Sequence, residues 1–243
     1  MEIKYAEPCQ DFSIERWHGG ERKSVEDTVI TESSITIHVD GKEVASLACS
    51  PWRYDELAVG YLYSEGVIDG LDDVKSIEID GDTVRVELTG ASEARNNQTS
   101  LESEPLVLEP SAVTRLSGAL ETMSSLFERT GGVHIAALSD GSQIIANCED
   151  IGRNNALTRL IGRCLFDGVS TKGKIVVFSG RVPEEVINRV IRAQFCMIIS
   201  CSAPTSLSIK LAEENGVTLI GFARSNRFNV YACPERVAFK RTD

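Results

Sequence analysis

Residues 111–224 alternate between helical and strand-like segments, and this alternation constrains the fold more than any other feature of the chain. A helix is expected over 111–129, followed by a hairpin built from "VHIAAL" and "QIIANC" and by a helix over 151–166. The apolar runs "KIVVFSG", "MIISCS" and "VTLIGFA" then alternate with two amphipathic segments, "PEEVINRVIRAQF" and "PTSLSIKLAEENG". Such an order predicts an α/β sandwich with a mostly parallel sheet.

The first part of the chain is strand-rich instead. "DTVITESSITIHVDGKEVASLACSP" alternates polar and apolar residues and turns at Asp40-Gly41, and "VKSIEIDGDTVRVEL" predicts a second hairpin that turns at Asp80-Gly81. "WRYDELAVGYLYSEGVI" between them predicts a helix that stops at Gly66. We therefore expect a smaller strand-rich domain over 1–110, with a polar interdomain loop over 89–105, and a second domain over 111–243.

Charge and cysteine content exclude several classes of protein. The chain has 25 Lys and Arg against 36 Asp and Glu, a net charge of −11, so sequence-independent nucleic-acid binding is not expected. The 7 cysteines are odd in number and have no C-x-x-C spacing, which argues against a disulfide framework or a zinc ribbon. Neither a signal peptide nor a membrane-spanning run is found, and these features together predict a reduced cytoplasmic protein.

Polar residues gather where four predicted strands end, and these ends should meet at one edge of the sheet. The residues in question are Glu149, Asp150, Arg153 and Asn155 after the first strand, Ser179-Gly180-Arg181 after the second, Cys201 to Ser206 after the third, and Phe222 to Arg227 after the fourth. Arginines beside helix N-termini favour an anion, most simply a phosphate or pyrophosphate.

A structural role is also open for single members of this set. Asp150 is placed to cap the following helix, and turn arginines are often solvated. His134 could be a structural hydrogen-bonding residue or a site residue that a ligand reaches past Gly131-Gly132. Cys148 and Cys201 could be activated thiols at the site edge or small buried hydrophobic residues.

Several long motifs resemble the FdhD sulfur carrier proteins, which are accessory factors for formate dehydrogenase. These motifs are "CSPWRYDELAVGYLYSEGVI", "GGVHIAAL", "EDIGRNNAL", "SGR", "SAPTSLSIKLAEENGVTLIGFARSNRFNVY" and "PERV". The resemblance covers nearly the whole chain. It implies that the second domain is a cytidine-deaminase-like α/β/α sandwich and that the protein forms a homodimer.

The resemblance also implies a function. Such proteins take sulfur from a cysteine desulfurase as a persulfide and pass it to the molybdenum (or tungsten) bis-molybdopterin guanine dinucleotide cofactor, which is then inserted into formate dehydrogenase. The family's cofactor-binding segment matches Phe222, Ala223, Arg224, Ser225, Asn226 and Arg227. Together with the residues at the other strand ends, the expected cofactor pocket also includes Arg181, Ser202, Glu149, Arg153 and His134.

The chain departs from the family pattern at two places. The family's interdomain C-x-x-C, one cysteine of which holds the persulfide, falls near Glu93 and Asn96, and the residue after the Gly-Arg pair of "EDIGR" is Asn154 where the family usually has His. A persulfide needs a thiolate sulfur. Another thiol such as Cys49 or Cys201 could carry the sulfur, or the sulfur could travel without residing on this chain, or the chain could be a non-catalytic cofactor escort.

A zinc-dependent deaminase is the remaining alternative, because of the fold that the resemblance implies. Such an enzyme needs an H-x-E motif and a P-C-x-x-C motif, and the chain has neither. "SAPTS" occupies the place of the second motif. No metal site is therefore expected.

Overall fold

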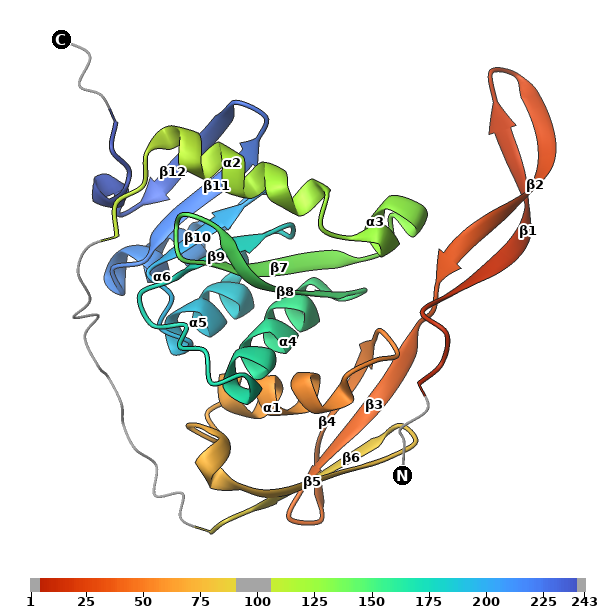
Figure 1. Cartoon of the computed structure of the whole chain (residues 1–243), viewed down its shortest axis with the longest axis horizontal. Coiled ribbons are helices and arrows are strands. Elements are labelled where there is room, and N and C mark those ends of the chain that lie inside the picture. The colour runs from red at the N-terminus through yellow and green to blue at the C-terminus, as the bar shows by residue number, and fades with distance from the viewer. Residues whose placement is uncertain (1–4, 91–105, 240–243) are drawn as a thin grey trace.

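The computed structural model describes residues 5–90 and 106–239, which fold around a four-stranded and a six-stranded sheet (Figure 1). The first sheet has the strand order β4-β3-β6-β5. Its strands are β3 (Ser33–Val39), β4 (Lys42–Cys49), β5 (Val74–Asp80) and β6 (Thr83–Leu88); the helix α1 (Tyr54–Ser64) and a short 3-10 helix, η1 (Leu71–Asp73), lie between β4 and β5 in the chain.

Both predicted hairpins are present in this sheet. Asp40 and Gly41 join β3 to β4 with φ values of 48° and 78°, the left-handed conformation that a two-residue turn of this kind requires. Gly81 lies between β5 and β6, which are antiparallel as expected. The helix α1 ends just before Gly66, whose φ is 75°.

A two-stranded ribbon precedes this sheet, and the sequence pattern did not predict it. Its strands β1 (Cys9–His18) and β2 (Glu21–Ile30) pair antiparallel around Gly19-Gly20 and project away from the rest of the molecule (Figure 1). Most of its side chains are exposed, so the ribbon has no buried face and therefore no clear alternation to detect.

The second part forms a six-stranded sheet with the order β12-β11-β10-β9-β7-β8. Its strands are β7 (His134–Ser139), β8 (Ile144–Asp150), β9 (Ile175–Phe178), β10 (Met197–Ser200), β11 (Thr218–Arg224) and β12 (Arg227–Ala232). Only β9, β10 and β11 are parallel neighbours, so the expected mostly parallel sheet is in fact mixed. The hairpins β7-β8 and β11-β12 at the two ends of the sheet supply two of the antiparallel pairs, and β7 with β9 supplies the third.

Helices cover both faces of this sheet. They are α2 (Pro110–Glu121), α3 (Ser125–Thr130), α4 (Arg153–Phe166), α5 (Glu184–Arg192) and α6 (Ser206–Glu214), with a final 3-10 helix, η2 (Pro234–Arg236). The single helix expected over 111–129 is wrong, because the chain breaks after α2 and Ser124 caps α3 by accepting the Phe127 N–H at 2.8 Å. None of the helices in the described part of the chain is long and apolar enough to cross a bilayer.

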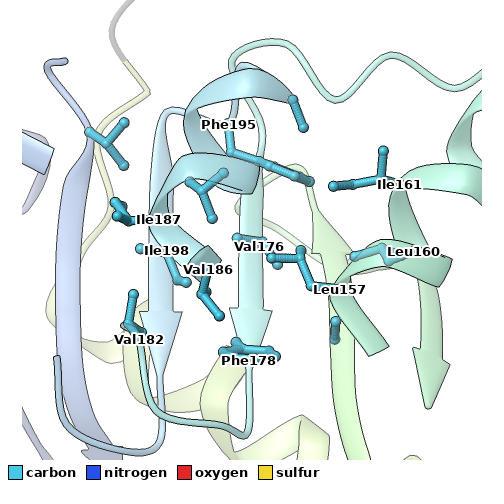
Figure 2. Close-up of a cluster of buried hydrophobic side chains, with 14 of the residues drawn as sticks. Leu157, Leu160, Ile161, Val176, Phe178, Val182, Val186, Ile187, Phe195 and Ile198 are labelled. Carbon is cyan, nitrogen blue, oxygen red and sulfur yellow. The ribbon is translucent and has the colours of Figure 1, made fainter. Parts of the chain in front are cut away.

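The strand alternation divides the apolar residues between two cores. Val176 and Phe178 of β9 face α4 and α5, where they pack with Leu157 and Val186 (Figure 2). Ile175 and Val177 of the same strand face the opposite side and pack beneath α2. The result is an α/β/α arrangement, with α2 on one side of the sheet and α4, α5 and α6 on the other (Figure 1).

The two sheets are joined through a crossing of α1 and α4 (Figure 1). Gly60 of α1 and Gly162 of α4 lie at this crossing, and a Cβ atom added to Gly60 would lie 1.9 Å from the backbone oxygen of Thr158. A Cβ atom added to Gly162 would lie equally close, at 1.9 Å, to the backbone oxygen of Glu56. Two glycines therefore allow the helix backbones to touch.

Candidate functional site

A pocket of about 610 Å³ opens at the edge of the six-stranded sheet where β9, β10 and β11 end. It lies on the α2 and α3 side of the sheet. Its lining residues are Leu120, Phe127, Gly131, Gly132, Val133, His134, Ile135, Ile151, Ser179, Cys201 and Arg224. The lining residues thus come from helices and strands that are far apart in the chain. Its size is that of a typical small-molecule site.

Strand direction explains why His134 lies at this edge. The strand β7 runs antiparallel to β9, so the first residue of β7 lies beside the last residues of β9. Ser179 directly follows β9, and its hydroxyl accepts the Ile135 N–H at 2.9 Å and lies 3.2 Å from Nδ1 of His134. The backbone N–H of Ser179 donates to the Ile135 carbonyl at 3.0 Å, which holds the corner in place.

The pocket combines a neutral imidazole with positive charge. Burial lowers the pKa of His134, and the nearby Arg153 guanidinium lowers it further. Nε of Arg153 is buried and has no hydrogen-bond partner within residues 5–90 and 106–239. Arg224 lines the pocket and donates from Nε to the Cys201 carbonyl at 2.8 Å. Arg153 itself does not line the pocket but adds positive charge near His134. One guanidinium group at a partly apolar wall, with a second positive charge close by, suits an anionic ligand that also has a flat apolar part.

The segment Phe222 to Arg227 lies where the sequence placed it, but its local structure differs from the expected turn. Phe222, Ala223 and Arg224 belong to the strand β11, and Arg227 begins β12, so the turn is only Ser225-Asn226. Ala223 is buried in the core, whereas Ser225, Asn226 and Arg227 are exposed next to Arg224. The side chain of Ala223 therefore cannot reach a ligand.

Two other expected site residues, Arg181 and Ser202, have separate environments. Arg181 is exposed on the loop between β9 and α5. Ser202 is held by backbone contacts, because its carbonyl accepts the Phe222 N–H at 3.0 Å and its N–H donates to Ser200 Oγ at 3.0 Å.

Glu149 does not join the set at the strand ends. Its carboxylate accepts a hydrogen bond from the Ser124 hydroxyl, and it lines a second pocket of about 260 Å³ with Trp52 and Arg163. The expectation that Glu149 joins the other strand ends in one pocket is therefore wrong, because β8 is the edge strand of the sheet and the Ser124 hydroxyl binds the carboxylate.

Asp150 has a different role from the helix cap that the sequence suggested. The N-cap of α4 is Gly152, and no side chain caps it. Asp150 is fully buried and accepts hydrogen bonds from Arg159 Nε at 2.7 Å and from the Ser50 N–H at 3.1 Å. The capping prediction is wrong because a buried arginine one and a half turns into α4 takes the carboxylate.

The sequence interpretation missed two features of the pocket. Ser179 was part of a noted turn but was not assigned a site role, although a hydroxyl directly after a buried strand was a usable signal. The apolar side formed by Leu120 and Phe127 could not be read from the sequence, because it depends on the break between α2 and α3.

Of the positions at which the chain departs from the family pattern, only Asn154 lies within the described residues. Glu93 and Asn96 lie outside the described residues. Asn154 lies in the first turn of α4, where its side-chain amide donates to the Glu185 carboxylate. Among residues 5–90 and 106–239 no group of three or more His, Cys, Asp or Glu side chains is arranged to hold a metal ion.

Comparison with known proteins gives consistent results. The model of the FdhD/NarQ family matches residues 30–106 and 90–238. A sulfur carrier protein FdhD from Staphylococcus haemolyticus is 37% identical over 256 residues, which cover 94% of this chain and 96% of that protein. A protein of the same name from Bacillus subtilis is 36% identical over 248 residues, covering 91% of this chain and 95% of that protein.

A solved structure shares the fold. A crystal structure described as that of a formate dehydrogenase accessory protein from Desulfotalea psychrophila superposes with a TM-score of 0.83. The match covers 95% of this chain and 100% of that chain at 22% sequence identity.

Proposed function

Because the chain belongs to the FdhD/NarQ family, we propose that it acts as a sulfur carrier protein and as an accessory protein of formate dehydrogenase. Its cargo would be the bis-molybdopterin guanine dinucleotide cofactor, and its sulfur would come from a cysteine desulfurase. The observation that supports cofactor binding best is the 610 Å³ pocket lined by His134, Ser179, Cys201 and Arg224.

The charges of the pocket favour the pyrophosphate of a guanine dinucleotide. Arg224 presents its guanidinium at the pocket wall, and Arg153 adds positive charge near His134 without lining the pocket. Leu120 and Phe127 offer an apolar surface for a flat ring. A pocket of this volume holds one nucleotide-sized end of the cofactor, and the rest would extend past the exposed Ser225, Asn226 and Arg227.

The proposed partners are those that the resemblance to the family implies. A cysteine desulfurase would supply the sulfur, formate dehydrogenase would receive the loaded cofactor, and a second copy of the chain would complete a homodimer. All of these would act in the cytoplasm, where thiols stay reduced.

Nucleotide binding tests the assigned pocket. We expect the protein to bind guanosine diphosphate, and the Arg224→Gln variant to bind it at least about tenfold more weakly, because the charged hydrogen bond to the pyrophosphate is lost. The glutamine amide keeps a donor for the Cys201 carbonyl. Isothermal calorimetry measures this. Arg85→Gln is the matched control, since Arg85 is exposed on β6 and pairs only with Asp80 among the residues described. Equal affinity of the two variants would exclude Arg224 from the binding site.

Restoration of formate dehydrogenase activity tests the accessory role. Expression of this chain in bacteria that lack their own family member should restore formate oxidation. No restoration by protein that is soluble and folded would contradict the proposal.

A cofactor escort without sulfur transfer is the second candidate. The absence of cysteine from residues 89–105 favours it, because the expected persulfide position is lost. An escort would bind guanosine diphosphate and support formate dehydrogenase without ever carrying sulfur. The two candidates therefore differ in one measurable product, a persulfide on this chain.

A further inference from the structure

All seven cysteines of the chain lie within the described residues. A covalently carried sulfur would therefore have to reside on Cys9, Cys49, Cys148, Cys164, Cys196, Cys201 or Cys233. Attack on a persulfide requires a thiolate that the donor can reach. Burial and position relative to the pocket can separate these seven candidates.

Five of the cysteines are poorly suited to this chemistry. Burial raises the pKa of Cys49 and of Cys148 to about 12, and that of Cys164 to about 11. Burial also raises the pKa of Cys196 and of Cys233. Cys49 is fully buried, so the structure argues against one of the two thiols that the sequence had suggested as a substitute.

The other two are Cys9 and Cys201, and only Cys201 lines the pocket. Cys9 lies at the start of the ribbon, where Nη2 of Arg129 lies 3.2 Å from its Sγ atom. Cys201 is partly exposed and directly follows β10. Its backbone is held on both sides, because its N–H donates to the Phe178 carbonyl at 2.9 Å and its carbonyl accepts from Arg224.

We propose that Cys201 is the residue that carries sulfur in this chain, as a persulfide inside the pocket that receives the cofactor. This inference rests on the proposed function. It is carried by the position of Cys201 on the same pocket wall as His134, Ser179 and Arg224. A sulfur loaded there would lie on the wall of the pocket that receives the cofactor.

The loading step balances without an added oxidant or reductant. The Cys201 thiolate attacks the outer sulfur of a persulfide on the donor protein, and the sulfur–sulfur bond of the donor breaks as the new one forms. The donor leaves as a thiolate. The proton that the Cys201 thiol loses goes to the imidazole of His134, a base that lines the same pocket and that burial keeps neutral.

Persulfide mapping tests this assignment. The full chain is incubated with a cysteine desulfurase and cysteine, and separately with a low-molecular-weight persulfide, and is then alkylated and analysed by intact-mass and peptide mass spectrometry. We expect the wild type to gain the mass of one sulfur atom on the peptide that contains Cys201. Cys9→Ser should gain it as well, and Cys201→Ser should not.

Three results would overturn the assignment: sulfur on a different cysteine, equal loading of Cys201→Ser, or no loading of folded wild type by either donor. Cys201→Ala and the melting temperatures of all variants separate a chemical effect from unfolding. Guanosine diphosphate binding is measured on the same samples. Binding without loading would reject Cys201 and leave the escort function, whereas loss of both binding and formate dehydrogenase support would reject the proposed function itself.

Discussion

Arg159 and Asp150 form a buried ion pair that connects the two parts of the chain. Arg159 is 1% exposed and Asp150 is 0% exposed, so neither charge is solvated. The guanidinium of Arg159 donates to the carbonyls of Ser50 at 2.8 Å and Arg53 at 2.9 Å, and also to that of Trp52. A side chain of α4 thus holds the backbone that leads from β4 into α1.

Replacing Arg159 should destabilise the protein strongly. Arg159→Met keeps much of the side-chain volume but leaves the Asp150 carboxylate buried without its cation, which typically costs about 3–5 kcal/mol. Urea denaturation measures the change in the free energy of unfolding.

Arg163→Met is the matched control, because Arg163 lies one turn further along α4 and its ion pair with Asp167 is exposed on both sides. Its replacement should cost no more than about 1 kcal/mol. Similar losses in the two variants would show that the buried pair contributes no more than a surface pair.

Among the secondary-structure elements, the crossing of α1 and α4 connects the two parts of the chain, as the buried ion pair does among the residues. Both helices place a glycine at the contact, and each glycine faces the backbone of the other helix. Ordinary side chains at these positions would separate the helices and so lift the first sheet from the second. The sequence shows these glycines only as interruptions of two helical patterns, and their role follows from the packing.

Gly60→Ala should therefore be destabilising even though alanine favours helices. The added Cβ atom would lie 1.9 Å from the Thr158 carbonyl oxygen, so the cost should reach or exceed the roughly 1–3 kcal/mol of a typical overpacked core. The thermal midpoint and urea denaturation measure it.

Gly118→Ala provides the control, since Gly118 lies inside α2 with open space around its missing Cβ. That change should leave stability unchanged or raise it by up to about 1 kcal/mol. A loss of stability at Gly118 as large as that at Gly60 would contradict the close-contact explanation.

At the scale of the whole molecule, the ion pair and the helix crossing should make the two sheets unfold together. Trp52 lies at their junction, with the Arg159 guanidinium 5.8 Å from its ring centroid, and Trp17 is the only other tryptophan in the chain. In a Trp17→Phe variant the fluorescence reports on the junction alone.

We expect the fluorescence of Trp52 and the far-ultraviolet ellipticity to change over the same range of urea concentration. Trp17 is exposed on the ribbon, so its replacement should not shift the midpoint of the ellipticity curve. A junction signal that is lost at clearly lower urea would show that the two parts unfold separately.

Most elements of the two main sheets, and the edge at which polar residues gather, can be predicted from the sequence alone. Apolar periodicity is a local property, so β9, β10, α5 and α6 could be located before any contact was known. His134 and the segment Phe222 to Arg227 stand out in the sequence because they lie beside predicted strand ends and in motifs that resemble the family's, and their role in cofactor binding stays a prediction. The exposed ribbon and the break between α2 and α3 left no such periodic signal.

Which of these residues come into contact depends on the packing of the folded chain. Asp150 binds Arg159 and Ser50, and Glu149 lines a separate pocket, although the two residues are adjacent in the chain. Cys49 is buried while Cys201 lines the pocket, a difference that spacing cannot show. Strand order and burial depend on contacts between residues that are far apart in the chain, and a local pattern carries no information about them.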